Sequence, residues 1–254
     1  MTESDMAAKQ QQGESWGELA KTVIYAGLIA IVIRTFLFQP FNIPSGSMEN
    51  TLLIGDYLFV EKFAYGYSRY TFPFGAWPFG NMMHGRLMGS QPQRGDVVVF
   101  KYPRDNSTDF IKRVIGLPGD TVQMKDDVLY LNGKPVPRER VPDYVGNLDG
   151  DEGHWTQYRE TLPGGKSYVT LDKTTEGPLD NTELFLVPAG HYFMMGDNRD
   201  NSDDSREAVG YVPAENLEGK ALFRFFSTDG SARLWEVWKW PFAIRYSRIL
   251  TLVK

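Results

Sequence analysis

The chain has no cysteine, which excludes thiolate catalysis, disulfide bonds and zinc sites with cysteine ligands. It has only three histidines, His84, His154 and His191, so a histidine-rich metal site is not expected and a Ser-His triad would have to use one of these. The 27 basic residues form no long run and are outnumbered by 32 acidic ones. A net charge of -5 therefore argues against a nucleic-acid-binding surface.

Long apolar runs are also scarce, and the strongest one covers Thr22–Gln39. As a helix this run would span ~27 Å at ~1.5 Å per residue, close to the ~30 Å core of a bilayer. No cleavage site of small residues follows it, so the run predicts a retained transmembrane anchor rather than a cleaved signal peptide. The polar residues 1–21 before it predict a disordered tail.

The segment after the anchor, FNIPSGSMENTLLIGD (Phe41–Asp56), holds two serines, Ser45 and Ser47, on a turn that begins with proline and contains glycine. Proline and glycine constrain such a turn, so it can present one hydroxyl in a defined direction, although an ordinary Gly-Ser turn has the same pattern. Ser47 follows Gln39 by only eight positions, or ~26 Å when extended at ~3.3 Å each. The turn must therefore lie near the membrane surface.

The rest of the chain predicts a mostly β fold: an antiparallel β-sheet catalytic domain with a β-rich insertion, preceded by one N-terminal transmembrane helix. Strands are expected at Asp96–Tyr102 and Asp109–Ile115, followed by a hairpin closed at Asn132-Gly133. A polar region at about 135–188, with short strands at 166–171 and 183–187, is expected to be the insertion. The expected domains are a tail at 1–21, an anchor at 22–39 and a catalytic domain at 40–254.

Lys112 lies in the second of these strands and shares a face with Phe110 and Val114. A lysine stem can pack on such a face while its ammonium reaches water. Burial would instead lower the pKa of the amine by up to ~3 to 5 units from ~10.4, and a neutral amine can act as a general base for a serine.

Three other segments allow more than one interpretation. The loop from Gly196 to Arg206 is rich in aspartate, but it lacks the glycine and glutamate that a calcium-binding loop requires, so calcium is rejected. The aromatic stretches at Tyr70–Gly85 and Leu234–Lys254 fit either contact with a membrane surface or packing on the domain.

Together these segments resemble the bacterial type I signal peptidases (leader peptidases), which are membrane-bound Ser-Lys serine proteases. The resemblance rests on blocks that stand in the order of the family and cover most of the catalytic region. These blocks are NIPSGSM (42–48), TLLIGD (51–56), RGDVVVF (94–100), FIKRVIGLPGD (110–120), MGDNRDNSDDSR (195–206) and GYVP (210–213).

The resemblance implies that Ser47 is the nucleophile, that Lys112 is the general base, and that Ser45 donates to an oxyanion hole beside the Ser47 N–H. It also implies that Ser202 orients Lys112 through a hydrogen bond. Three further roles follow in the same way. Asp204 and Arg206 would form a stabilising ion pair, and Arg113 and Gly196 would support the site.

The resemblance also implies that shallow apolar pockets admit small side chains of an extended substrate, which would bind at a sheet edge. By the same resemblance, the partners of the protein would be preproteins with signal peptides and the lipid bilayer, with no nucleic acid, no metal and no cofactor. The protein would be located in the bacterial plasma membrane, as a single-pass protein with the catalytic domain on the extracytoplasmic (periplasmic) side. The implied pocket residues are Phe41, Ile43, Pro44, Met48, Leu52, Val99, Phe110 and Ile111.

Three alternative functions fit parts of the sequence. One is a Ser-His hydrolase that uses His191 with Asp197, since His191 directly precedes the polar loop. Another is a membrane-anchored β scaffold that binds peptides without cutting them. The third, a soluble self-cleaving repressor with Ser-Lys chemistry, is disfavoured because a membrane span rather than a DNA-binding domain precedes the serine.

Overall fold

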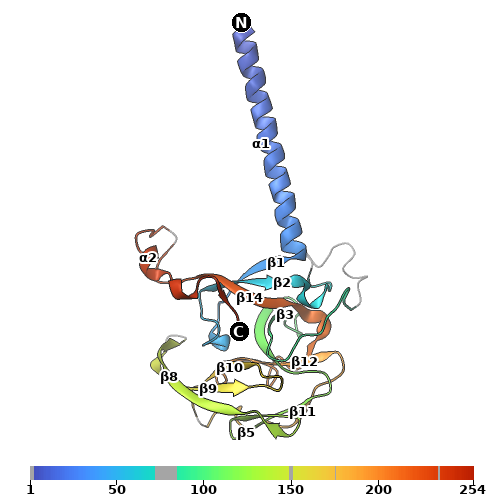
Figure 1. Ribbon diagram of the computed structural model, residues 1–254, viewed down its shortest axis with the longest axis vertical. Coiled ribbons are helices and arrows are strands. Elements are labelled where there is room, and N and C mark those ends of the chain that lie inside the picture. The colour runs from blue at the N-terminus through green and yellow to red at the C-terminus, as the bar shows by residue number, and fades with distance from the viewer. Residues whose placement is uncertain (1–2, 72–84, 149–150, 175, 234) are drawn as a thin grey trace.

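The computed structural model describes residues 3–71, 85–148, 151–174, 176–233 and 235–254. Within these residues the protein is mostly β: a long helix, α1 (Glu3–Phe36), stands on a curled body of antiparallel sheets (Figure 1). The fold class predicted from the sequence is therefore confirmed.

The helix α1 corrects two predictions about the N-terminal region. The predicted disordered tail is wrong, because the helix begins at Glu3 and its first turns are rich in residues that favour helix. Trp16–Phe36 is long and apolar enough to cross a membrane, and the described part of the chain has one such helix. The predicted span ends too late, because the last helical hydrogen bond is donated by Leu37 and Gln39 already lies in a strand.

The main sheet lies next to α1 and contains eight strands within the described residues. Their order is β1-β2-β14-β3-β4-β12-β13, with β15 paired to β14, and every pairing is antiparallel. Pro40 is tolerated in β1 because that strand forms an edge of the sheet. The strands are β1 (Phe38–Asn42), β2 (Asp56–Glu61), β3 (Val97–Lys101), β4 (Asp109–Gly116), β12 (His191–Met195), β13 (Val212–Pro213), β14 (Leu217–Ser227) and β15 (Thr251–Leu252).

The strands β3 and β4 confirm the two predicted at Asp96–Tyr102 and Asp109–Ile115. Short 3₁₀ helices connect parts of this sheet, and the first of them carries Ser47. These helices are η1 (Gly46–Met48), η2 (Lys62–Tyr65), η5 (Ala214–Asn216) and η6 (Tyr246–Arg248).

A second sheet, in the order β11-β5-β6-β7, lies at the end of the body far from α1 (Figure 1). The predicted turn at Asn132-Gly133 closes β6 and β7 with φ angles of 52° and 73°. The turn between β5 and β6 was not predicted; it is made by Asp126 and Asp127, which also have positive φ. The strands are β5 (Thr121–Lys125), β6 (Val128–Leu131), β7 (Lys134–Pro135) and β11 (Phe185–Leu186).

The region predicted as an insertion, 135–188, contains all three strands of a third sheet, in the order β10-β9-β8. The predicted short strands appear as β10 and β11, but the long hairpin of β8 and β9 was not predicted. Leu162 and Tyr168 of this region share a buried cluster with Ile115 and Phe193 of the main sheet, so the insertion is part of the body. The strands are β8 (Arg138–Leu148), β9 (Asp151–Thr161) and β10 (Ser167–Asp172).

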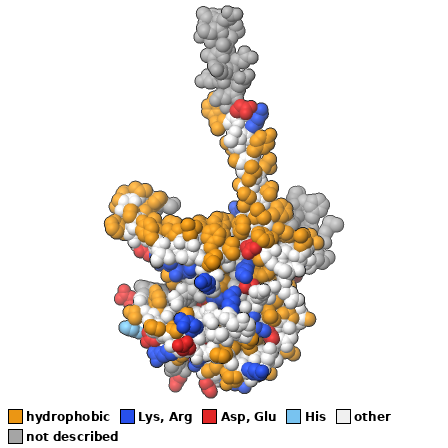
Figure 2. Space-filling view, in the orientation of Figure 1, with side chains coloured by type: hydrophobic (Ala, Val, Ile, Leu, Met, Phe, Trp, Pro, Cys, Tyr) orange, Lys and Arg blue, Asp and Glu red, His pale blue; other side chains and the backbone are white. Residues whose placement is uncertain are grey.

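Apolar side chains cover much of α1 from Trp16 onward and continue over the end of the body next to it (Figure 2). They include Trp235, Trp238 and Phe242 around the short helix α2 (Trp240–Ala243), and Phe242 is 87% exposed. The C-terminal segment packs on the domain through β15, which joins the sheet, while these aromatic side chains stay exposed. Most of the other aromatic stretch, Tyr70–Gly85, lies outside the described residues.

Candidate active site

Ser47 lies in η1, where the chain leaves the apolar core and turns back toward β2. Met48, the next residue, is fully buried in an apolar cluster and anchors the turn. The turn is closed by hydrogen bonds from Glu49 N to Gly46 O (3.0 Å) and from Leu52 N to Met48 O (2.8 Å). These contacts hold the Ser47 side chain in one position, as the proline and glycine of the sequence predict.

Lys112 is the residue that meets this serine, although 65 positions separate the two. It lies in β4 opposite Val98 of β3, and only 3% of it is exposed. Its Nζ donates a hydrogen bond to Ser47 Oγ. The structure therefore brings together the two residues that the sequence selects for nucleophilic chemistry.

Burial lowers the pKa of Lys112 from 10.5 to about 8, because removal from water disfavours the ammonium form. The carboxylates of Asp204 and Asp203 oppose this shift, and Arg206 adds to it. With a pKa of about 8, about a tenth of the amine is neutral at pH 7. In the neutral form Nζ can accept the proton of Ser47 Oγ through the same contact.

Both residues open into a cleft of about 450 Å³ between η1 and the start of β4. Ser45 lies on its wall in an extended conformation, and its hydroxyl has no hydrogen-bond partner among the described residues. Such a hydroxyl is free to bind a ligand in the cleft. The cleft is lined by Pro44, Ser45, Gly46, Ser47, Asp109, Phe110, Ile111, Lys112, Asn201 and Asp203.

Of the predicted pocket residues, Pro44, Phe110 and Ile111 line the cleft and the other five do not. Those five pack in the apolar cluster that supports η1, against which Ile111 also packs. They are Phe41, Ile43, Met48, Leu52 and Val99. The acidic and polar lining from Asp109, Asn201 and Asp203 was not predicted.

The loop after β12 covers one side of the dyad. A Cβ atom at Gly196 would lie 2.2 Å from Ser202 Oγ and 2.5 Å from Ser47 O, so no side chain fits there. Arg206 and Asp204 form the predicted ion pair at 2.9 Å. Burial raises the pKa of Asp204, but this pair and the backbone N–H groups of Gly196 and Arg206 together lower it below its usual value. The predicted bond from Ser202 to Lys112 is absent, because the Ser202 hydroxyl donates to Asp204 Oδ2 (2.9 Å) instead.

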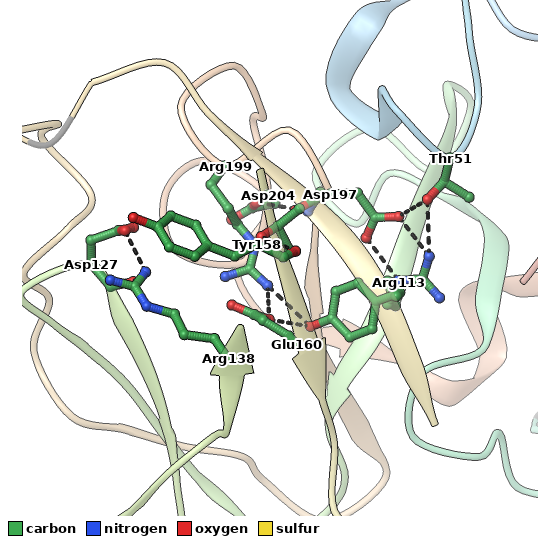
Figure 3. Close-up of polar contacts among 12 residues, drawn as sticks. Thr51, Arg113, Asp127, Arg138, Tyr158, Glu160, Asp197, Arg199 and Asp204 are labelled. Atoms are coloured by element: carbon green, nitrogen blue, oxygen red, sulfur yellow. Dashed lines mark hydrogen bonds and ion pairs between the residues drawn. The ribbon is translucent and has the colours of Figure 1, made fainter. Parts of the chain in front are cut away.

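Arg113 supports the site through a buried ion pair with Asp197 (Figure 3). Arg113 Nε and Nη2 donate to the two carboxylate oxygens of Asp197 at 2.7 and 2.6 Å, and Thr51 Oγ1 donates to the same carboxylate. Asp197 is thereby occupied, whereas His191 hydrogen-bonds the carbonyl of Ala189. The structure therefore does not assemble a triad from His191 and Asp197.

Several supporting residues were missed from the sequence. Asn198 and Arg199 stand in the MGDNRDNSDDSR block, so the block itself was a signal for them. Glu160 and Tyr168 lie in the insertion and had no sequence signal, because only the fold brings them to Arg199 (Figure 3). Within the described residues, no group of three or more His, Asp or Glu side chains is arranged to hold a metal ion.

Comparison with known proteins places this geometry in context. The family model "Signal peptidase, peptidase S26" matches residues 16–226. The chain is 45% identical over 206 residues to signal peptidase I of Rickettsia typhi (strain ATCC VR-144 / Wilmington), covering 79% of this chain and 76% of the relative. It is 42% identical over 232 residues to signal peptidase I of Rickettsia conorii (strain ATCC VR-613 / Malish 7), covering 89% and 82%. A crystal structure of a signal peptidase I from Enterococcus faecalis V583 has 32% identity, covers 52% of this chain and 97% of that chain, and gives a TM-score of 0.31.

Proposed function

The chain belongs to the signal peptidase family, peptidase S26, and on this premise we propose that it removes signal peptides with Ser47 as nucleophile and Lys112 as general base. Membership in this family makes it a serine peptidase. The observation that carries the assignment of the dyad is the hydrogen bond between Lys112 Nζ and Ser47 Oγ inside a cleft.

The proposed chemistry starts from neutral Lys112. As Ser47 Oγ attacks the scissile carbonyl carbon, Nζ takes the hydroxyl proton and becomes an ammonium. The ammonium then gives that proton to the leaving amine, and the peptide C–N bond breaks to leave an acyl-enzyme ester. Water attacks the ester with Lys112 again as base, which releases the signal peptide and restores Ser47.

The oxyanion of each tetrahedral intermediate would be stabilised by the Ser45 hydroxyl and the Ser47 N–H. The unpartnered Ser45 hydroxyl on the cleft wall supports this role, because its proton is not committed to another acceptor among the described residues. Ser202 would act through Asp204 rather than by orienting Lys112 directly. Gly196, Arg113, Asp204 and Arg206 would keep the wall beside the dyad rigid.

The substrate would bind as an extended strand along the first half of β4. β12 pairs with β4 only from Arg113 onward, so Asp109–Lys112 keep one edge unpaired among the described strands. A peptide can add its backbone to such an edge. Pro44, Phe110 and Ile111 would then contact its side chains, in a shallow cleft suited to small residues before the cut.

The anchor and the exposed apolar surface support a place at the bilayer. On α1, Val23, Ile24 and Leu28 are each more than half exposed, which is unfavourable in water and favourable in lipid. We place α1 through the bacterial plasma membrane as a single anchor and the body on the extracytoplasmic side. The apolar end of the body around α2 would rest on lipid (Figure 2). The chain then divides into the anchor and a catalytic domain that begins at β1.

The test is cleavage of a precursor with a small-x-small site by detergent-solubilised wild type, Ser47→Ala, Lys112→Ala and Lys112→Arg. We expect each variant to lose at least ~100-fold in kcat, and Lys112→Arg to fail because arginine stays charged and cannot accept the proton. Lys125→Ala, on an exposed part of β5, is the matched control and should cut normally.

Unimpaired cutting by Lys112→Ala would eliminate the proposed mechanism. His191→Ala should keep full activity, and a large loss of activity in this variant would support the Ser-His hydrolase instead. The peptide-binding scaffold requires that Ser47→Ala keeps the function of the wild type, whereas our proposal requires that it binds precursor without cutting.

A further inference from the structure

The 135–188 insertion, which has no counterpart among the family blocks, reaches the loop that holds the nucleophile. Glu160 of β9 and Tyr168 of β10 are paired across the two strands. Tyr168 Oη donates a 2.6 Å hydrogen bond to Glu160 Oε2, and the two residues are 5% and 2% exposed. Burial and the neighbouring Glu160 carboxylate raise the pKa of Tyr168, so its hydroxyl stays protonated over the assay range.

Arg199 joins this pair from the loop after β12 (Figure 3). Its Nη2 donates to Glu160 Oε2 at 2.5 Å and to Tyr168 Oη at 3.0 Å. Arg199 is 3% exposed, and its Nη1 has no hydrogen-bond partner among the described residues. The buried guanidinium therefore depends on Glu160 for its countercharge.

The backbone of the loop is attached to the same strand. Leu171 N of β10 donates to Asp197 O, and Arg199 N donates to Leu171 O, both at 2.9 Å. Arg199 Nε also donates to Gly196 O at 3.2 Å. The insertion thus holds residues 196–199 by main chain and by side chain.

Two residues of this segment, Gly196 and Asn198, contact the turn that carries the nucleophile. Asn198 N donates to Ser47 O and Asn198 Nδ2 donates to Gly46 O, both at 3.2 Å. Gly196 faces Ser47 O so closely that no Cβ atom fits between them. A displacement of the loop therefore displaces Ser47.

We propose that Glu160, Tyr168 and Arg199 form a positioning unit by which the insertion sets the loop against the turn of Ser47. This inference rests on the proposed dyad. None of the three lines the cleft, so they act through the loop and do not touch the substrate there. A misplacement of about 1 Å can cost about 100-fold in rate, which makes the unit a determinant of kcat.

The positioning unit also affects the pKa of Lys112, the proposed general base. Asp203 and Asp204 follow on the same loop, and both raise the pKa of Lys112. When the loop moves, their distance from Nζ changes, and the pH dependence of cleavage moves with it. A purely structural role would lower the amount of folded enzyme without moving the pH profile.

The experiment compares full-length Glu160→Gln and Tyr168→Phe with wild type in kcat, KM and the pH profile of kcat/KM, normalised to folded protein by circular dichroism. We expect kcat to fall about 10- to 100-fold in Glu160→Gln, with KM nearly unchanged and the acid limb shifted. Tyr168→Phe should fall less, because its ring stays under the Arg113 guanidinium at 4.2 Å. Glu160→Asp, which keeps the charge, should recover part of the loss.

Arg138→Gln is the matched control. Arg138 also pairs with a carboxylate, Asp127, and lies over a tyrosine ring, Tyr158, but it donates no hydrogen bond to the 196–206 loop (Figure 3). It should keep the kcat and the pH profile of wild type.

Folded Glu160→Gln and Tyr168→Phe with wild-type kcat and pH profile would overturn the inference, as would a loss that disappears on normalisation to folded protein. If Glu160→Gln does not fold, Tyr168→Phe still tests the inference, because this variant removes only one oxygen atom. Failure of the dyad itself is distinguishable, because it shows as cleavage by Ser47→Ala or Lys112→Ala.

Discussion

At the scale of single residues, the decisive feature is a lysine whose charge is unstable where it lies. Lys112 is 3% exposed, and burial lowers its pKa to about 8 in spite of Asp203 and Asp204. Since the neutral amine is the reactive form, kcat/KM should be low below this pKa and should rise as the pH increases through about 8. The acid limb of the profile therefore reports the environment of one amine.

The variant Asp203→Asn tests this environment. Asp203 lines the cleft, and its carboxylate raises the pKa of Lys112, so its removal should shift the acid limb of kcat/KM to lower pH. The measurement is the pH profile at constant ionic strength, with Asp143→Asn on β8 as control. An unchanged or upward-shifted limb in Asp203→Asn would contradict the electrostatic explanation.

At the scale of elements, the segment around α2 both continues into a strand of the main sheet and exposes aromatic side chains on the surface. Phe242 and the tryptophans of this segment are exposed, whereas Ala243 is buried and the following β15 pairs with β14. Amphipathic tryptophan rings favour the membrane interface, so this element is suited to hold the body against the bilayer.

In reconstituted vesicles with brominated lipids, a variant that keeps only Trp238 should be strongly quenched. Trp238 is 65% exposed beside α2. A variant that keeps only Trp155 is the control, because Trp155 is 9% exposed in β9 of the insertion and should keep its emission. Equal quenching of the two tryptophans would contradict docking through this end of the body.

At the scale of the whole molecule, the active site is tied to the anchor by a short connection. Ser47 follows the end of α1 by only β1 and part of a turn, and α1 stands directly on the main sheet (Figure 1). A site held near the bilayer meets a membrane-bound precursor at high effective concentration. The effective concentration of a short soluble peptide is not raised by that placement.

Leu28→Arg places a charge within the span, at a cost of about 2.5 to 3.5 kcal/mol for insertion at the helix centre. We expect this variant to process a membrane-integrated precursor at least ~10-fold more slowly, while it cuts a short peptide in detergent at the wild-type rate. The ratio of the two rates is the measurement, and Leu28→Met is the control. Equal losses on both substrates would show that the anchor affects the site itself.

Much of this architecture could be predicted because local patterns carry it. Runs of β-branched and apolar residues indicated β3 and β4, the Asn132-Gly133 turn indicated a hairpin, and the long apolar run indicated the span. The span was misplaced at both ends because composition gives no sharp boundary: helix formers extended α1 back to Glu3, and pairing with β2 ended it before Gln39.

The sequence by itself determined which residues we propose for the chemistry, because lack of cysteine and scarcity of histidine leave a lysine as the candidate base for a serine on a constrained turn. Only the tertiary structure decided the partners. In the folded protein the Ser202 hydroxyl pairs with Asp204, four expected pocket residues are buried in the core with Phe41 partly buried beside them, and Glu160 is joined to Arg199 over 39 positions. Residue type and local period act over a few neighbours, whereas the partner of a buried polar group depends on which distant strands pack together.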